Sequence, residues 1–281
     1  MIEEIRQTCR TLLEAGTVNV VIAYGQSNPD GPVHPIFVTK PDDVEKIVWN
    51  KQCFANLTTY LTRKEVKSLG KAAILVKGCD ARSLVVLVQE SQVERSDVHV
   101  IGLACEGVGE PELAGKCRVC EVHMPVGVDV TIGSTEAAAP EGQNRYALVD
   151  EFMKKSPEER MAFWKQEFER CVRCYACRGV CPLCYCNQCI VDKNRPVVID
   201  TSATLKGNFA WNITRAFHLA GRCVSCGECT RVCPAGIDLR MLNASLAQSA
   251  EKHFNYRAGM DPETPPVIGT YNAEDKENFI R

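Results

Sequence analysis

The sequence lacks any hydrophobic run long enough to cross a bilayer, because a stretch such as LVVLV, at 84 to 88, falls far short of the about 20 residues a spanning helix needs. It also lacks an excess of charge of one sign, since 33 basic and 35 acidic residues leave a formal net charge of −2. The scattered basic residues indicate no surface for nucleic acid or for an anionic membrane. The acidic start, MIEEIRQTCR, has no apolar core of a secretory signal. We therefore expect a soluble, cytoplasmic protein without a membrane span or a nucleic acid partner.

Two cofactor motifs are also missing. No C-x-x-C-H sequence occurs, which excludes covalently attached haem. The glycines of GVG, at 107 to 109, do not complete a G-x-G-x-x-G fingerprint followed by a helix, so no dinucleotide site is indicated. Four histidines are isolated in the sequence, and surface or core roles suit them better than metal binding: His34, His99, His123 and His218.

Cysteine, by contrast, is abundant, with 17 residues in a chain of 281. Because cytosolic thiols are kept reduced, we expect no disulfide framework, and dense cysteine then indicates metal binding or redox chemistry. The densest segment, CVRCYACRGVCPLCYCNQC at 171 to 189, holds seven cysteines. One zinc ion or one 4Fe-4S cluster uses four thiolates, so this segment is expected to serve more than one site.

The N-terminal part alternates between helical and strand-like patterns. The expected elements are a helix at 2 to 13, strands at 18 to 24 and 35 to 39, a strand at 71 to 77, a turn at Gly78-Cys79-Asp80, a helix at 81 to 90 and a strand at 98 to 103. The last four form a β-α-β unit with short connections, which favours a parallel or mixed sheet. In such sheets ligands gather at the carboxyl ends of the strands. We expect residues 1 to 135 to form an α/β domain.

The C-terminal part has a different organisation. Residues 136 to 150 are mostly small and polar, which is typical of a linker. A capping box at Ser156 to Glu159 then predicts a helix that runs to Cys171. Together with helices expected at about 209 to 220 and 239 to 254, it makes residues 151 to 256 a mostly α-helical domain. We expect the tail, 257 to 281, to be extended, either disordered or laid along a partner.

One internal repeat carries the chemistry: CVRCYACRGVCP at 171 to 182 and CVSCGECTRVCP at 223 to 234. Both read C-x2-C-x2-C-x3-C-P, the run with which two-cluster ferredoxins hold 4Fe-4S clusters, the fourth cysteine of each run ligating the other cluster. A zinc ribbon has no need of the third and fourth cysteines. The first set of ligands is expected to be Cys171, Cys174, Cys177 and Cys233. The second set is expected to be Cys223, Cys226, Cys229 and Cys181. Because the ligation crosses between the runs, cluster binding would fold this domain.

Nine cysteines lie outside these two sets. Cys9 falls on the apolar stripe of the first helix and is expected in the core. Four others are predicted to form a third set that binds another 4Fe-4S cluster: Cys79 and Cys105 after two strand ends, and the C-x2-C pair of Cys117 and Cys120. A zinc site on the same residues, or buried thiols beside a redox dithiol, stays open. A further alternative for Cys79 is an activated nucleophile, because Arg82 lies one turn later on the helix. No histidine lies nearby in the sequence to act as its base.

The last cysteines raise the question of a fourth cluster. Cys184, Cys186 and Cys189 follow the spacing C-x-C-x2-C and could supply three thiolates from one loop. Cys53 has no cysteine near it in the sequence and could supply the fourth. These four form the fourth set. The alternative is that they are exposed or core thiols beside the ferredoxin-type domain, since free cysteine is often simply buried.

Three segments carry a resemblance to a known family. VKGCDARSLVVLVQE, VIGLACEGVG and KCRVC, followed by the dicluster module, resemble the beta subunits of deazaflavin-reducing hydrogenases and formate dehydrogenases. The resemblance covers roughly residues 18 to 260. It matches Cys79 and Cys105 to the turn cysteine and to the cysteine after the next strand in that family. It departs at Gly78-Cys79-Asp80, where the deazaflavin-reducing members typically carry a Pro-Cys-Gln turn.

The resemblance implies an iron–sulfur subunit that relays electrons in a cytoplasmic complex of the formate dehydrogenase, hydrogenase or heterodisulfide reductase type. Its partners would be a catalytic subunit and a flavoprotein or ferredoxin, and no residue would act as a catalytic acid or base. Two alternatives stay open. One is a flavoenzyme that uses FAD in the N-terminal domain to oxidise or reduce a soluble deazaflavin, flavin or nicotinamide coenzyme, and the other is a zinc-bearing interaction module. The sequence identifies no residues for FAD.

Overall fold

One mixed sheet organises the N-terminal region of the computed structural model, which describes residues 1–136, 144–193, 195–271 and 273. Its strands lie in the order β2-β1-β3-β4-β5. Their bounds are β1 Val20–Gln26, β2 Val33–Val38, β3 Ala72–Val76, β4 Val98–Leu103 and β5 Val130–Ile132. β1 and β2 pair antiparallel, and the remaining pairs are parallel. The α/β prediction is thus confirmed for this region, whereas the three-residue strand β5 was not predicted because it is too short to show an alternating pattern.

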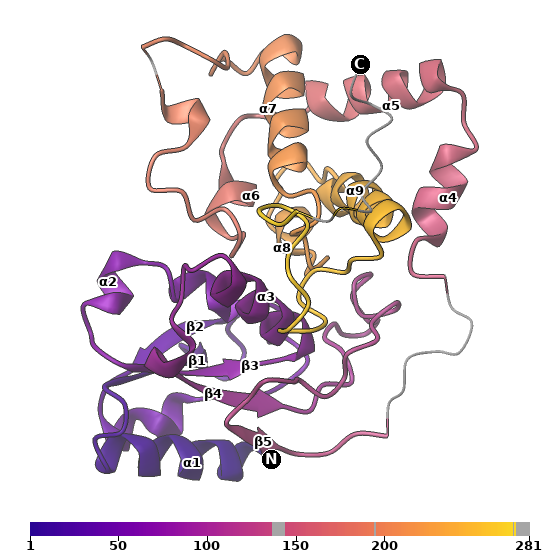
Figure 1. The fold of residues 1–281 in the computed structure, drawn as a ribbon. Coiled ribbons are helices and arrows are strands. Elements are labelled where there is room, and N and C mark those ends of the chain that lie inside the picture. The colour runs from indigo at the N-terminus through magenta and orange to yellow at the C-terminus, as the bar shows by residue number, and fades with distance from the viewer. Residues whose placement is uncertain (137–143, 194, 272, 274–281) are drawn as a thin grey trace.

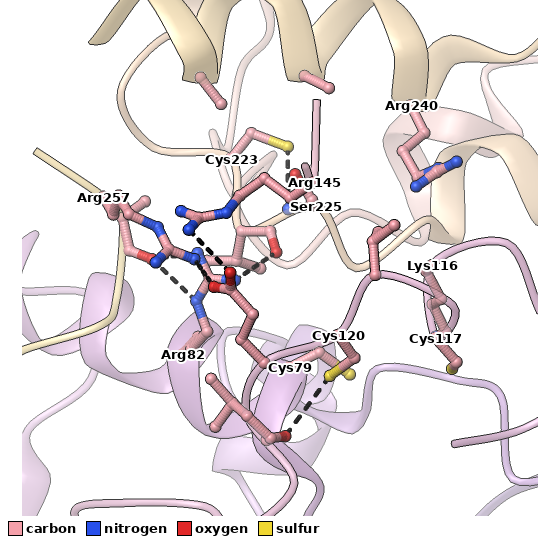
Figure 2. Close-up of a pocket in the computed structure, with 18 of the residues that line it drawn as sticks. Cys79, Arg82, Lys116, Cys117, Cys120, Arg145, Cys223, Ser225, Arg240 and Arg257 are labelled. Atoms are coloured by element: carbon pink, nitrogen blue, oxygen red, sulfur yellow. Dashed lines mark hydrogen bonds and ion pairs between the residues drawn. The ribbon is translucent and has the colours of Figure 1, made fainter. Parts of the chain in front are cut away.

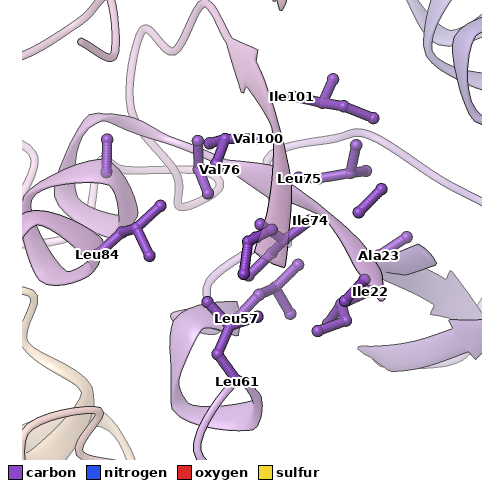
Figure 3. Close-up of a cluster of buried hydrophobic side chains, with 14 of the residues drawn as sticks. Ile22, Ala23, Leu57, Leu61, Ile74, Leu75, Val76, Leu84, Val100 and Ile101 are labelled. Carbon is purple, nitrogen blue, oxygen red and sulfur yellow. The ribbon is translucent and has the colours of Figure 1, made fainter. Parts of the chain in front are cut away.

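Helices cover both faces of this sheet (Figure 1). α1 (Ile2–Glu14) lies on one side, and α3 (Gly78–Gln89) lies on the other, toward the C-terminal region. Shorter helices complete the connections: η1 Pro41–Lys46, η2 Leu57–Tyr60, α2 Lys64–Lys67 and η3 Arg95–Asp97. Every residue of β3 is buried, as expected for a parallel strand covered on both faces. Figure 3 shows the resulting core, formed by aliphatic side chains of β1, β3 and β4 with Leu57, Leu61 and Leu84.

The C-terminal region consists of helices and loops. Its elements are α4 Ala147–Met153, α5 Pro157–Glu169, α6 Ala176–Gly179, η4 Ile190–Asp192, α7 Leu205–His218, α8 Glu228–Arg231 and α9 Leu239–Phe254. The capping box predicted for α5 is present, because the Ser156 hydroxyl accepts the Glu159 N–H and the Glu159 carboxylate accepts the Ser156 N–H. Along the described residues, no helix is both long enough and apolar enough to cross a bilayer.

Two segments differ from what the sequence patterns indicate. α4 begins inside the stretch predicted as a linker, because Val149 is buried and Asp150 accepts a hydrogen bond from Gln248 of α9. Residues 137–143 of that stretch lie outside the described residues. The tail, expected to be extended, packs against α3 of its own chain: Arg82 donates to the Ala258 carbonyl at 2.8 and 3.1 Å. α3 is therefore one of the elements through which the two regions meet, beside ion pairs such as Lys116–Glu228 and Arg257–Glu121.

Candidate iron–sulfur centres

The two cysteine runs adopt the same local backbone. In each run the residues on either side of the second cysteine have a positive φ: Arg173 (56°) and Tyr175 (59°) in the first run, Ser225 (58°) and Gly227 (73°) in the second. Each run then forms a one-turn helix, and these helices, α6 and α8, contact each other. Left-handed residues of this kind aim backbone N–H groups at a common point, an arrangement found at anion and iron–sulfur sites.

The first set of cysteines surrounds one cavity. Its members line that cavity together with Trp211 and Asn212 of α7: Cys171, Cys174, Cys177 and Cys233. The structure therefore brings Cys233, from the second run, to the three leading cysteines of the first run. Cys174 is exposed, whereas burial raises the pKa of Cys177 to about 11. Because the thiolate is the form that binds metal, a buried thiol of this kind needs a nearby positive partner to ionise.

The second set is more deeply buried than the first. Burial raises the pKa of Cys223 to about 12, and it also raises the pKa values of Cys226 and Cys229. Electrostatic repulsion from Cys181, which belongs to the first run, contributes to the raised pKa of all three. Cys181 therefore lies among the leading cysteines of the second run. The arrangement is the one that crossed ligation requires.

Amide and backbone N–H groups reach sulfur atoms in both sets. Asn212 of α7 donates to the Cys171 sulfur at 3.8 Å, and Asn243 of α9 donates to the Cys229 sulfur at 3.7 Å. The Ser225 backbone N–H donates to the Cys223 sulfur at 3.4 Å. Hydrogen bonds to ligand sulfurs are one of the means by which proteins set cluster potentials. The sequence patterns did not indicate these two asparagines.

Arg215 is a buried cation between the first two sets. Its side chain, in the last turn of α7, is 4% exposed and donates to the Cys177 carbonyl at 3.1 Å. Its positive charge counteracts the effect of burial on the pKa of the Cys229 and Cys184 thiols. Burial by itself would lower the pKa of Arg215, but the surrounding cysteines, Cys181 foremost, raise it on balance. No carboxylate in the described part of the chain forms an ion pair with it.

The third set lines a cavity of about 100 Å³ between the two regions (Figure 2). All four predicted cysteines, Cys79, Cys105, Cys117 and Cys120, border it, and so does Cys223 of the second set. Cys79 lies in the first turn of α3 and Cys105 just after β4, at the carboxyl ends of adjacent parallel strands. The parallel sheet therefore brings these two cysteines together, as the sequence patterns predict.

A close backbone approach places the C-x2-C pair beside α3. A Cβ added at Gly78 would lie 1.9 Å from the Val122 carbonyl oxygen, so only glycine lets the segment after Cys120 pass so near the start of the helix. The Val108 N–H donates to the Cys117 sulfur at 3.3 Å. His123, isolated in the sequence, has a ring nitrogen 2.9 Å from the Cys105 carbonyl oxygen.

Buried cations also surround the third set. Lys116 is nearly enclosed, donates to the Phe54 carbonyl at 3.1 Å and has Cys79 as its foremost attractive neighbour. Arg82 donates to the backbone carbonyls of Val224 and Ala258, and the described residues offer it no carboxylate partner. Its negative neighbours are the cysteines Cys223, Cys79 and Cys120. Burying a cation without a counter-charge is costly, so these cysteines are expected to carry negative charge.

The environment of Cys79 is wrong for an activated nucleophile. Burial and the adjacent Asp80 raise the pKa of this thiol well above its usual value, although Lys116 and Lys77 oppose the shift. Activation would require a lowered pKa. Cys9, expected in the core, is fully buried there, and burial raises its pKa to about 12.

The structure does not bring the fourth set together. Cys53 is fully buried in the sheet region, and its charged neighbours are Lys77, Cys105 and Asp80 near the start of α3. Tyr185, which stands between Cys184 and Cys186, instead donates to Glu90 at the end of α3. α3 has 12 residues and is therefore about 18 Å long. Cys184 interacts electrostatically with Cys181 of the second set, and Cys186 is exposed.

The residues of the first three sets fit 4Fe-4S clusters. Each set offers four cysteines, and all 17 cysteines of the chain are free. Among the described residues Arg82 and Arg215 have no carboxylate partner, whereas Lys116 has the Glu228 carboxylate 3.9 Å away. The first and second sets follow the ligand pattern of two-cluster ferredoxins, three thiolates from one loop and a fourth from the other run. The third set differs, because two of its cysteines come from one loop and the other two each follow a strand. In the part of the chain that the structure describes, no group of three or more His, Cys, Asp or Glu side chains is arranged to hold a single metal ion.

Comparison with known proteins agrees with these features. Residues 166–237 match the family model of the 4Fe-4S dicluster domain. The chain is 23% identical to F420-dependent formate dehydrogenase 1 subunit beta of Methanococcus maripaludis, over 92% of this chain and 90% of that protein. It is 22% identical to the F420-dependent formate dehydrogenase subunit beta of Methanocaldococcus jannaschii, over 92% and 91%. It is 32% identical to polyferredoxin protein MvhB of Methanothermus fervidus, over 28% of this chain and 22% of that protein. The resemblance to the beta-subunit family is thereby confirmed.

Proposed function

We propose that this chain, which resembles formate dehydrogenase beta subunits over most of its length, is an iron–sulfur electron-transfer subunit of a multi-subunit redox complex. The observation that carries the proposal is the meeting of three four-cysteine sets, two of them within a 4Fe-4S dicluster domain. When bound, a 4Fe-4S cluster supplies a reversible electron acceptor whose potential the protein sets within about −700 to +450 mV. We assign the first, second and third sets as its ligands.

The sets adjoin one another in a fixed order. Cys223 of the second set borders the cavity of the third set, and Cys226 interacts electrostatically with Cys79. At the other side, Cys229 of the second set interacts with Cys177 of the first. The first set ends at the exposed Cys174 and at Val172, which is 62% exposed. This order supports an electron path from the cavity between the regions to the surface at Cys174.

The other residues of the chain hold this path and set its charge. Trp164 and Phe168 of α5 pack with Cys171 and Cys177 and keep water away from the first set. Lys116 and Arg82 place positive charge between the third and second sets, and Arg215 places it between the second and first. Positive charge near a cluster favours its reduced form, because reduction adds a negative charge.

We also propose a formate dehydrogenase as the complex, because two relatives are named as beta subunits of that enzyme. A tagged chain purified anaerobically from its host should bring a catalytic subunit with it, and formate should then bleach the iron–sulfur absorbance. Hydrogen added to the same sample is the control. Bleaching by hydrogen and not by formate would contradict the choice of formate.

The function is tested by analysing the anaerobically purified chain for iron, sulfide, zinc and flavin. We expect about 12 iron and about 12 sulfide per chain, with no flavin and no zinc, because three cubane clusters fill three sets. Cys105→Ser should remove about four of the iron atoms. Cys186→Ser is the matched control, because Cys186 is exposed and lies outside the three sets, so its iron content should equal that of the wild type.

Other compositions would support other functions. About eight iron atoms per chain with one bound FAD would contradict the three-cluster assignment and support the flavoenzyme. FAD would then have to bind outside the cavity at the third set, whose volume of about 100 Å³ is below the roughly 300 to 1,000 Å³ of clefts that bind drug-sized organic molecules. Stoichiometric zinc would support the interaction module. About 16 iron atoms per chain would support a fourth cluster bound by the fourth set.

A further inference from the structure

We propose that Arg215 is a positioning residue that sets the reduction potentials of the first-set and second-set clusters together. The inference rests on the proposed function, since it requires both clusters to be present. It goes beyond that function because it assigns to one side chain outside the cysteine sets a shared effect on two redox centres.

The position of Arg215 supports a shared effect. α7 carries it to a place where its guanidinium donates to the carbonyl of Cys177, a first-set cysteine, and where its charge acts on the thiol of Cys229, a second-set cysteine. Its charge also acts on Cys184 and on Cys181 of the second set. A lysine at this position would keep the positive charge without the planar donor group of the guanidinium, so it separates the effect of charge from that of hydrogen bonding.

The charge of Arg215 has no other partner. The side chain is 4% exposed, no carboxylate of the described residues pairs with it, and its Nε atom has no hydrogen-bond partner. A buried arginine cannot relieve this by losing its proton, because its pKa stays far above the physiological range. Its field therefore falls on the cysteines around it, and in a low-dielectric interior that field is screened little.

Two nearby residues provide local controls. Asn212 hydrogen-bonds to a sulfur of the first set only, through Cys171. Asn243 hydrogen-bonds to a sulfur of the second set only, through Cys229. Asn212 lies on the same helix as Arg215, so a general disturbance of α7 would also appear in an Asn212 variant. If a change of Arg215 shifts the reduction potentials of both clusters, and a change of either asparagine shifts the potential of one cluster only, the shared effect belongs to the cation.

The test is a redox titration followed by electron paramagnetic resonance on the full chain with its clusters bound. Asn212→Ala and Asn243→Ala assign the two signals, because each should shift one midpoint potential. Arg215→Met should make both midpoints more negative, with at least a tenfold loss in each reduction equilibrium constant, which corresponds to about 59 mV for a one-electron couple. Arg215→Lys keeps the charge, so both of its midpoint potentials should stay closer to the wild-type values than those of Arg215→Met.

Several results would overturn the inference. One is that both midpoint potentials of Arg215→Met equal those of the wild type, and another is that only one of them shifts. A third is that the potentials of Arg215→Lys shift as far as those of Arg215→Met. Iron analysis precedes each titration. If Arg215→Met and a second neutral variant, Arg215→Gln, both lose a cluster, Arg215 is required for assembly and the inference is wrong. Absence of iron–sulfur clusters from the wild-type chain would instead refute the proposed function, so the two failures are distinguishable.

Discussion

At the scale of single residues, polar side chains distinguish the cysteines that form a set from those that only contact one. Cys184 interacts electrostatically with Cys181 and with Arg215, so this surplus cysteine lies beside the second set without belonging to it. Cys53 lies at the other end of α3, beside Cys105. The cysteine-rich segment thus contributes three ligands to one proposed centre, one ligand to the next, and a thiol that contacts that ligand.

Crossed ligation makes a prediction at this scale. Cys181→Ser should lose the cluster of the second set, about four iron atoms per chain, although Cys181 is close in sequence to the first set. The reason is that Cys181 lies among Cys223, Cys226 and Cys229. Iron analysis and electron paramagnetic resonance measure the loss.

Two further variants serve as controls for Cys181→Ser. Cys174→Ser should affect the first-set signal, and Cys186→Ser should affect neither, because Cys186 is exposed and belongs to neither set. If Cys181→Ser removed the same signal as Cys174→Ser, ligation would follow the sequence runs and the crossed assignment would be wrong.

At the scale of secondary-structure elements, α3 connects the two regions at both of its ends. Its first turn carries Cys79 of the third set, and Arg82 one turn later donates to the backbone of Val224 in the second run. At its other end Glu90 forms an ion pair with Arg222, just before that run. α3 therefore helps to fix the third set relative to the second, together with the Lys116–Glu228 ion pair between the two segments.

Glu90→Gln tests the far end of that connection. The side chains of Glu90 and Arg222 are 14% and 16% exposed, so removing one charge leaves the other poorly solvated, and we expect a loss of about 1 to 3 kcal/mol in stability. Thermal melting followed by circular dichroism should show a fall of about 2 to 4 °C per kcal/mol.

Glu151→Gln is the control for this prediction. Glu151 pairs with Lys154 at the surface, where both side chains are 69% exposed, and exposed pairs contribute little to stability. Its melting temperature should match that of the wild type. A fall in Glu151→Gln equal to that in Glu90→Gln would mean that overall charge, and not the α3 connection, is responsible.

At the scale of the whole molecule, the sheet region and the helical region are each stabilised in a different way. The sheet region has a large apolar core built on β1, β3 and β4. The main helical cluster has few buried apolar residues, namely Trp164, Phe168, Ile237 and Leu239 beside Cys229. A core this small favours a region whose folding depends on bound metal, as in other small metal-binding domains.

Removal of iron should therefore affect the two regions unequally. After oxidation and chelation of iron, amide hydrogen exchange should become fast in residues 166–237 and remain slow in β1, β3 and β4. Mass spectrometry of peptic fragments measures both regions in one sample. Equal loss of protection in both regions would show that the sheet also depends on the clusters, whereas no loss would show that the helical region folds without them.

Local patterns predicted much of the fold and of the site. The β-α-β unit, the capping box at Ser156 and the helix over 239 to 254 follow from short-range periodicity and capping, and all are present. The meeting of Cys79 and Cys105 follows from the rule that parallel strands end at one edge. Arg215 and Asn243 carry no such signal, because each contacts its cysteine only after separate helices have packed.

The sequence by itself determined the sheet region, the repeated cysteine runs and the presence of a 4Fe-4S dicluster domain, because spacing along the chain encodes periodicity and ligand loops directly. Only the tertiary structure decided which cysteines meet across long sequence separations, that Cys53 stays apart from Cys184, and which cations lie between the sets. The physical reason is that burial and charge compensation depend on the packing of several elements at once, and no single stretch of sequence records that packing.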